Sequence, residues 1–307
     1  MIDALKQQIG SCFIGKEEVV ENVLICLLSG GHILIEDVPG VGKTTLAKAL
    51  AGSLDLSFGR IQFTPDTLPG DVTGVSIYNM KTQAFEYREG AIMRHILLAD
   101  EINRTSPKTQ AALLEAMEEG SVTVDGRTYD LPDPFMVIAT QNPIEFIGTY
   151  PLPEASVDRF MMRLAIGYPD QAREVQMVRN QMEEKNVRTM QPVCDNTAIK
   201  KLKAAAAAVS VTDAVITYAD DIVRLTRAES RFVLGASPRA LLALVRAAKA
   251  KAYLQGRDYV KPDDIKAVAL PVLHHRLTLT PEARIAGEKV DALLTALILK
   301  AKVPMEK

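Results

Sequence analysis

A glycine-rich segment that contains a lysine is the first part of the sequence that could do chemistry. It runs Pro39-Gly40-Val41-Gly42-Lys43-Thr44-Thr45, between the apolar run HILIE and the helical pattern LAKALAG. Glycines let the backbone curl so that its N–H groups face an anion, and a helix N-terminus adds partial positive charge. We therefore predict a P-loop that binds ATP, in which Lys43 reaches the β- and γ-phosphates and Thr44 binds Mg²⁺.

The segment departs from the P-loop consensus at its first position. The consensus has glycine there, and this chain has Asp37. Because Gly40, Gly42, Lys43 and Thr44 keep the parts that surround phosphate, we interpret the change as minor.

Two adjacent acids form a second candidate site. Asp100 and Glu101 follow the apolar run ILLA, which predicts a buried strand. Because successive strand residues point to opposite faces, Asp100 could hold Mg²⁺ while Glu101 orients the attacking water. An acidic strand end is common by itself, but together with a P-loop it indicates ATP hydrolysis.

A polar strand end and two arginines complete the candidate residues. Asn142 follows the run FMVIATQ and could orient the same water, or could simply form a turn before Pro143. Arg239 lies in the first turn of a predicted helix, where a cation opposes the helix dipole and therefore suggests a bound anion. Arg159 precedes the last predicted strand, and its spacing is equally compatible with a surface ion pair with Asp158.

The elements that must position these residues alternate between strands and helices. Apolar runs predict strands at 32–36, 60–63, 96–100, 135–140 and 163–168. The runs ILLAD and FMVIAT lack polar alternation, as parallel strands covered on both faces do. One helix is predicted after Lys43 and another over 107–119, with Ser106 as N-cap and Gly120 as the stop.

Two hairpins and a change of pattern set the domain organisation. Hairpins are predicted at 75–90 and 122–131, and the strand pattern stops at residue 169. We therefore predict an α/β nucleotide-binding domain over 1–169 and an all-α domain over 170–307, with helices to the C-terminus.

The composition agrees with a globular protein and excludes several classes. The 307 residues are 48% hydrophobic, and the net charge of −2 gives no basic excess for coating nucleic acid. Three widely spaced cysteines without a CxxC motif predict no disulfide framework and fit a reducing compartment. The apolar runs are too short to span a bilayer and no signal segment is visible, so we expect a cytoplasmic protein without membrane insertion.

Six segments, taken in order, resemble one protein family. They are EDVPGVGKTTLAKAL, LLADEINR, PKTQAALLEAMEEG, IATQNP, EASVDRF and GASPRA. This set closely resembles the MoxR family of AAA+ ATPases, and the match covers nearly the whole chain. The resemblance implies a P-loop αβα sandwich with a parallel sheet and a hairpin insert, followed by a C-terminal all-α lid domain.

The resemblance also implies roles for the candidate residues in binding and hydrolysing Mg-ATP. Residues 40–45 would be Walker A, and Asp100 and Glu101 would be Walker B. Asn142 would be sensor 1, and Arg239 would be the nucleotide-binding sensor 2 of the lid.

Two further assignments rest on the resemblance. Arg159 would be an arginine finger that reaches into a neighbouring subunit of a hexameric ring. Arg163 is a rival, but Arg159 matches the DRF position of the family. Ile14 and Gly15 resemble the segment that lines the adenine pocket of AAA+ proteins.

The resemblance implies a chaperone-like remodeller or activator of protein complexes, often with partners that carry a von Willebrand factor A domain. One alternative is a nucleic-acid motor, because Lys81, Arg88 and Arg127 near the hairpins could meet a phosphate backbone. Further alternatives are a motor subunit of the metal-chelatase type and a nucleotide-gated scaffold with little turnover. The presence of Glu101, Asn142 and Arg159 argues against the scaffold.

Overall fold

The computed structural model describes residues 1–142, 149–182 and 190–304. The chain divides into two compact units, which we describe separately. The first contains residues 1–21, 32–159 and 164–200, and the second contains the remainder. This division follows packing and not chain order, and the domain boundary near residue 170 stays a prediction.

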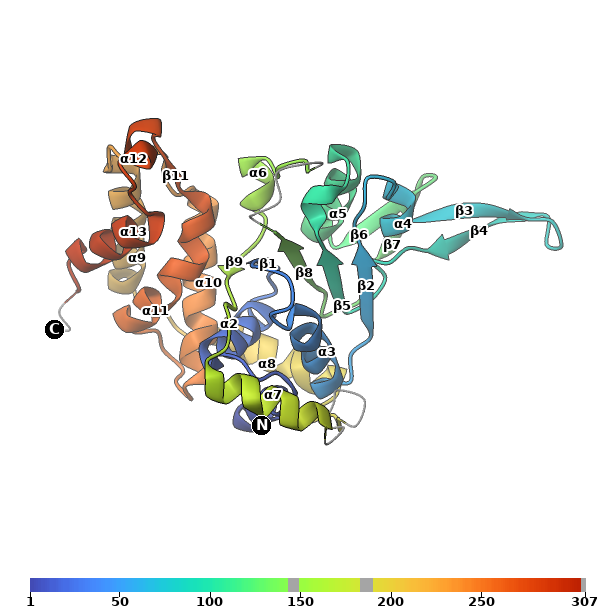
Figure 1. Cartoon of the computed structure of the whole chain (residues 1–307), viewed down its shortest axis with the longest axis horizontal. Coiled ribbons are helices and arrows are strands. Elements are labelled where there is room, and N and C mark those ends of the chain that lie inside the picture. Colours follow the sequence, from blue (N-terminus) through green and yellow to red (C-terminus); the bar gives the residue numbers. More distant parts are fainter. Residues whose placement is uncertain (143–148, 183–189, 305–307) are drawn as a thin grey trace. The chain divides into compact units, whose positions relative to one another are not determined.

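A five-stranded sheet is the centre of the nucleotide-binding fold (Figure 1). Its strand order is β2 (Phe58–Gln62), β5 (Ile96–Asp100), β8 (Met136–Gln141), β1 (Ile33–Glu36) and β9 (Met162–Leu164). The pairs β2–β5, β5–β8 and β8–β1 are parallel. Strands β5, β8 and β1 are buried along almost their whole length, which explains their continuous apolar sequences. The predicted α/β fold is confirmed.

The strand expected at 163–168 needs correction, because β9 ends at Leu164. Gly167 takes φ +69°, a conformation outside the β region, and Pro169 has no N–H to donate to a neighbouring strand. The chain therefore leaves the sheet before residue 168 and forms a loop instead.

Most helices of the first unit lie between strands in the chain, and α1 precedes the first strand. They are α1 (Ile2–Cys12), α3 (Lys43–Ser53), the short α4 (Pro69–Thr73), α5 (Pro107–Glu119), the short α6 (Glu154–Val157) and α7 (Gln171–Met182). Two others, α2 (Glu17–Leu28) and α8 (Asn196–Ala208), contribute residues to both units. The predicted caps of α5 are confirmed: the Ser106 side chain accepts from Thr109 N, and Gly120 is left-handed at the C-cap.

Two hairpins interrupt the alternation, as predicted. One pairs β3 (Gly74–Asn79) with β4 (Ala84–Glu89), and the other pairs β6 (Ser121–Val124) with β7 (Arg127–Asp130). The β3–β4 hairpin projects as a long ribbon beyond the α4–α5 region (Figure 1). Its root requires glycine, because a Cβ on Gly90 would lie 2.2 Å from the backbone oxygen of Val72.

The second unit is built mainly from α9 (Asp213–Ala228), α10 (Pro238–Leu254), α11 (Pro262–Leu273), the short α12 (Pro281–Ile285) and α13 (Val290–Lys300). The expectation of helices alone was wrong in one place. Strand β10 (Phe232–Leu234) pairs antiparallel with β11 (Thr278–Leu279). Strands of two or three residues are too short to produce a recognisable alternating pattern, and their pairing joins segments that are distant in sequence.

Two expectations from the sequence concern the cysteines and the longer helices. None of the three cysteines forms a disulfide. Within the described ranges, no helix is both long and apolar enough to cross a membrane.

Candidate active site

The loop predicted to bind phosphate connects β1 to α3. Gly40 and Gly42 take φ +86° and +89°, the left-handed region that glycine adopts without a steric cost, and Gly42 is the N-cap of α3. Lys43 is the first residue of the helix, and its Nζ donates to the backbone oxygen of Asp37 at 2.6 Å. Burial lowers the pKa of Lys43, while the charges of nearby acids, first among them Asp37, act in the opposite direction.

Asp37 makes contacts that the consensus glycine could not make. Its side chain accepts hydrogen bonds from Val38 N at 2.9 Å and from Gly167 N at 2.6 Å. The residue is only 8% exposed. Asp37 therefore joins the phosphate loop to the loop that follows β9, so the change from the consensus is larger than the sequence suggested.

Most of the predicted catalytic residues border one cleft of about 360 Å³. Because the strands are parallel, the carboxyl ends of β1, β5 and β8 meet at one edge of the sheet. The P-loop residues Lys43 and Thr44 follow β1, Asp100 ends β5, and Asn142 follows β8. The turn considered before Pro143 lies outside the described residues.

Asp100 ends β5 and is nearly buried. Its Oδ1 accepts from the hydroxyl of Thr140 at 3.1 Å, and its Oδ2 accepts from Arg60 Nε at 2.7 Å. The hydroxyl of Thr44 and the carboxylate of Asp100 are hard oxygen ligands that border the same cleft, which suits Mg²⁺. The residues present therefore fit the expected metal.

Glu101 corrects the prediction based on strand alternation. It lies after β5, has φ +56°, and begins the 3₁₀ turn η1 (Ile102–Arg104). Because the backbone turns here, alternation does not decide where the side chain points, and Asp100 and Glu101 border the same cleft. A non-glycine residue in the left-handed region is strained, and such residues concentrate at functional sites.

Besides Thr140, three polar residues that the sequence analysis did not single out contact the two acids. Glu101 Oε2 accepts from Gln62 Nε2 at 2.8 Å and from Arg104 Nη1 at 3.0 Å. Arg60 Nη2 also donates to Gln62 Oε1 at 3.1 Å. Arg60 and Gln62 are two residues apart on β2, the strand beside β5, and therefore point to the same face. Two polar residues at this spacing near the end of a strand were the sequence feature that could have revealed them.

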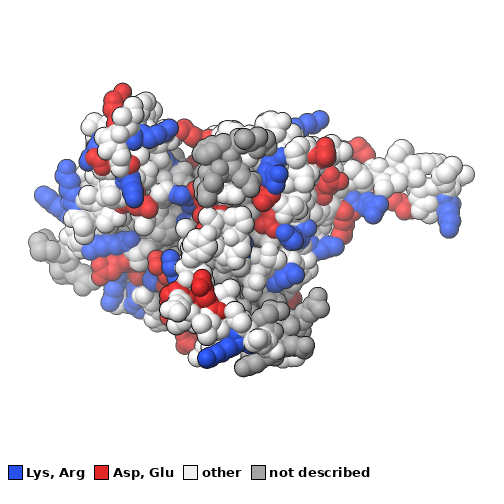
Figure 2. Space-filling view, in the orientation of Figure 1, with Lys and Arg blue, Asp and Glu red and all other residues white. Residues whose placement is uncertain are grey.

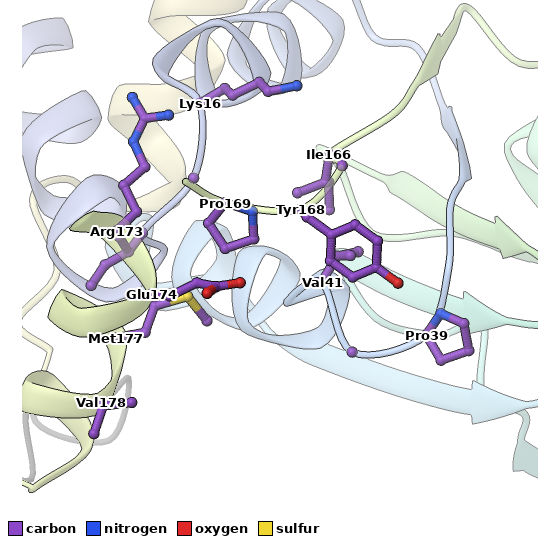
Figure 3. Close-up of a pocket in the computed structure, with 14 residues that line it drawn as sticks. Lys16, Pro39, Val41, Ile166, Tyr168, Pro169, Arg173, Glu174, Met177 and Val178 are labelled. Atoms are coloured by element: carbon purple, nitrogen blue, oxygen red, sulfur yellow. The ribbon is translucent and has the colours of Figure 1, made fainter. Parts of the chain in front are cut away.

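A second pocket, of about 510 Å³, is lined in part by the predicted Ile14 and Gly15. Pro39, Gly40 and Val41 of the P-loop also line it, together with 166–169 and part of α7. Figure 3 shows Arg173, Glu174, Met177 and Val178 of α7 on the left of the pocket, and Val41 and Tyr168 to the right of them. Gly15 cannot carry a side chain here without displacing the Phe13 ring, because a Cβ on Gly15 would lie 2.2 Å from that ring.

The predicted arginines lie on separate elements. Arg159 follows α6 and forms an ion pair with Glu118 of α5 at 3.0 Å. It lines neither of the two pockets described above. Arg163 lies in β9. Arg239 lies in the first turn of α10 in the second unit, where the Ser237 side chain accepts from Ala240 N. The functional roles of these arginines stay predictions.

Comparison with known proteins identifies both parts of the chain. Residues 32–162 match the ATPase family associated with various cellular activities (AAA), and residues 224–297 match the AAA lid domain. The chain is 50% identical over 301 residues to the uncharacterized protein YeaC of Bacillus subtilis, covering 98% of this chain and 94% of that protein.

Two further relatives agree. The chain is 41% identical over 280 residues to the chaperone MoxR1 of Mycobacterium tuberculosis, covering 88% of this chain and 74% of that protein. A crystal structure of a protein from Cytophaga hutchinsonii, provisionally assigned as an ATPase, superimposes with a TM-score of 0.93 at 38% identity. That comparison covers 99% of this chain and 95% of the other. The resemblance seen in the sequence is confirmed: the chain belongs to the MoxR family of AAA+ ATPases and is an ATP hydrolase.

Proposed function

We propose that this ATPase hydrolyses Mg-ATP in the cleft beside β5 and works in a ring of identical subunits to remodel or activate protein complexes. The observation that carries the catalytic part is the convergence of Lys43, Thr44, Asp100, Glu101 and Asn142 on one cleft at the edge of a parallel sheet. Phosphoryl transfer needs mainly positioning and charge neutralisation, and these residue types supply both.

Each residue has a role that follows from its chemistry. The loop N–H groups and Lys43 bind the phosphates, while Thr44 and Asp100 hold the metal. Mg²⁺, when bound, supplies charge neutralisation at the phosphate oxygens. Glu101 orients the attacking water and Asn142 assists from the neighbouring strand. The second pocket, which contains Ile14 and Gly15, receives the base.

The ring explains the place of the arginines. We assign Arg159 as a finger for a neighbouring subunit, and its position outside both pockets supports a partner elsewhere. A head-to-tail contact of this kind closes into a ring when the rotation permits, and we expect six subunits. We further assign residues 1–169 to nucleotide binding and 170–307, with sensor 2 at Arg239, to the lid.

The β3–β4 hairpin favours a protein client over nucleic acid. Its outer part carries the exposed apolar side chains Tyr78, Met80 and Phe85, the last two 84% and 68% exposed. Figure 2 shows this outer part mostly white with one basic group at its end, and acidic and basic side chains are mixed over the face in view. The similarity to the chaperone MoxR1 supports a protein client as well. We further propose a cytoplasmic location and a partner carrying a von Willebrand factor A domain, as the family resemblance in the sequence implies.

Replacing the proposed water-orienting acid should separate binding from turnover. Glu101→Gln should reduce ATP hydrolysis by at least about a hundredfold, because the amide cannot accept a proton from water. Binding of a fluorescent ATP analogue should stay within about twofold of wild type. Steady-state phosphate release and equilibrium titration measure the two effects. Unchanged turnover in this variant would remove Glu101 from the mechanism.

A finger supplied by a neighbour should show complementation between variants. Arg159→Ala should lose turnover by a factor on the order of 10³ while retaining ATP binding. Mixing it with Glu101→Gln should restore part of the activity, because some interfaces then combine an intact Glu101 with an intact Arg159. Arg163→Ala, tested in the same mixture, decides between the two arginines. Absence of rescue in both mixtures would contradict a finger in trans.

The client should be a protein held by the hairpin. In the presence of ATP, the Glu101→Gln variant should remain bound to its protein client. Adding Tyr78→Ser and Phe85→Ser to that variant should abolish the binding, because the exposed apolar contacts are lost. Ile285→Ser, which removes an exposed apolar side chain from α12, is the matched control and should retain it. Salt-sensitive stimulation of turnover by DNA, unaffected by the hairpin variant, would favour a nucleic-acid motor instead.

Asp37 should link phosphate binding to base binding. Asp37→Gly restores the consensus but removes the acceptor of Gly167 N, so the walls of the base pocket lose a connection. We expect the affinity for ATP to fall about tenfold, about 1.4 kcal/mol, while the affinity for inorganic tripolyphosphate changes less. Asp37→Asn keeps one acceptor oxygen, so its affinity for ATP should lie between those of wild type and Asp37→Gly. Equal ATP affinities for wild type and Asp37→Gly in calorimetric titrations would refute the link.

A further inference from the structure

Arg60 places a positive charge against the acid that is proposed to hold Mg²⁺. It lies on β2, whose residues Arg60 and Gln62 pair in register with Leu98 and Asp100 of β5. The Arg60 side chain is 49% exposed and borders the catalytic cleft, whereas the Asp100 side chain is 11% exposed. The guanidinium therefore pairs with Asp100 while remaining partly accessible to solvent at the cleft.

Both oxygens of Asp100 already have partners. Oδ1 accepts from the buried hydroxyl of Thr140, which is neutral, and Oδ2 accepts a charge-assisted hydrogen bond from Arg60 Nε at 2.7 Å. Two cations at one carboxylate repel each other, and this repulsion is stronger in a partly buried cleft than in water. A divalent ion that binds Asp100 must therefore compete with Arg60.

We propose that Arg60 is a cation that neutralises Asp100 when no metal is bound and is displaced when Mg²⁺ binds. The proposal rests on the function given above, in which Asp100 is a metal ligand. Arg60 is thus a positioning residue, which sets how strongly ATP binding depends on metal. It keeps the cleft from repelling the phosphates of metal-free ATP, and it opposes the binding of metal by itself.

A hydrogen-bonded path leads from Arg60 to the proposed catalytic acid. Arg60 Nη2 donates to Gln62 Oε1, and Gln62 Nε2 donates to Glu101 Oε2. When Arg60 leaves Asp100, it also loses the geometry that holds it against Gln62. The binding of metal at Asp100 therefore changes the hydrogen bonding of Glu101, the next residue in the chain.

The contacts of Arg60 favour this role over direct binding of phosphate. Its ion pair and its hydrogen bond go to side chains on β5 and β2, whereas Lys43 is the cation that the phosphate loop itself provides. An arginine that binds phosphate would strengthen the binding of Mg-ATP. An arginine that neutralises Asp100 would instead strengthen the binding of ATP without metal.

The test compares nucleotide binding with and without metal. Dissociation constants for a fluorescent non-hydrolysable ATP analogue are measured in EDTA and in excess Mg²⁺. For Arg60→Gln we expect weaker binding of the analogue in EDTA and unchanged or tighter binding in Mg²⁺. The dissociation constant in EDTA divided by that in Mg²⁺ should therefore rise about threefold or more. Electron paramagnetic resonance of free Mn²⁺ should show that Mn²⁺ alone binds the variant about threefold more tightly.

Two further variants control for charge. Arg224→Gln removes an arginine whose Nε pairs with Asp220 on the exposed face of α9, and it should leave both measurements unchanged. Arg60→Lys keeps the charge and should retain most of the wild-type ratio. A rise in the ratio for Arg60→Lys as large as that for Arg60→Gln would overturn the proposal. A ratio that falls or stays constant in Arg60→Gln, or weaker Mn²⁺ binding, would overturn it as well.

Asp100→Asn separates this inference from the proposed function. If Asp100→Asn binds Mn²⁺ as wild type does, Asp100 is not the metal ligand and the proposed function fails at that point. If Asp100→Asn loses Mn²⁺ while Arg60→Gln behaves as wild type, only the role of Arg60 fails. Thermal unfolding of each variant confirms that the compared proteins are folded.

Discussion

The parallel register of the central sheet is the constraint on which the active site depends. Backbone hydrogen bonds place Glu36 beside Gln141 and Gln62 beside Asp100, so the strands end at one edge. Each strand end then delivers a different kind of group: a loop of N–H donors, a pair of acids or an amide. Without that register, the same residues would be spread along the sheet and would share no cleft.

The residues that the sequence made predictable are those that follow directly from a buried strand or open a helix. Lys43 and Asp100 are examples, because an apolar run fixes the strand and the polar residue after it must lie at its end. Arg60 and Gln62 were not predictable in this way. Their contacts depend on which strand is the neighbour of β5 and on the register between them, and neither is written in the local sequence.

Backbone conformation limited the prediction at two other points. Strand alternation describes the chain as far as Asp100. Glu101 takes a left-handed conformation, and the chain turns there into η1. The Glu101 backbone N–H donates to the hydroxyl of Thr140 at this turn. The loop after β9 likewise depends on Gly167. The short β10–β11 pair was missed because so few residues carry no periodic signal.

The acids of the site already accept hydrogen bonds from neighbouring groups, from backbone N–H groups at Asp37 and from side chains at Asp100 and Glu101. Asp37 accepts from Gly167 N, which lines the second pocket, and Asp100 and Glu101 are connected through Arg60 and Gln62. In the proposed exchange at Asp100, a bound metal replaces the ion pair with Arg60, so its effect extends to a side chain of β2. Since the projecting hairpin follows β2 in the chain through α4, β2 is the element through which the state of the cleft could reach the proposed client surface.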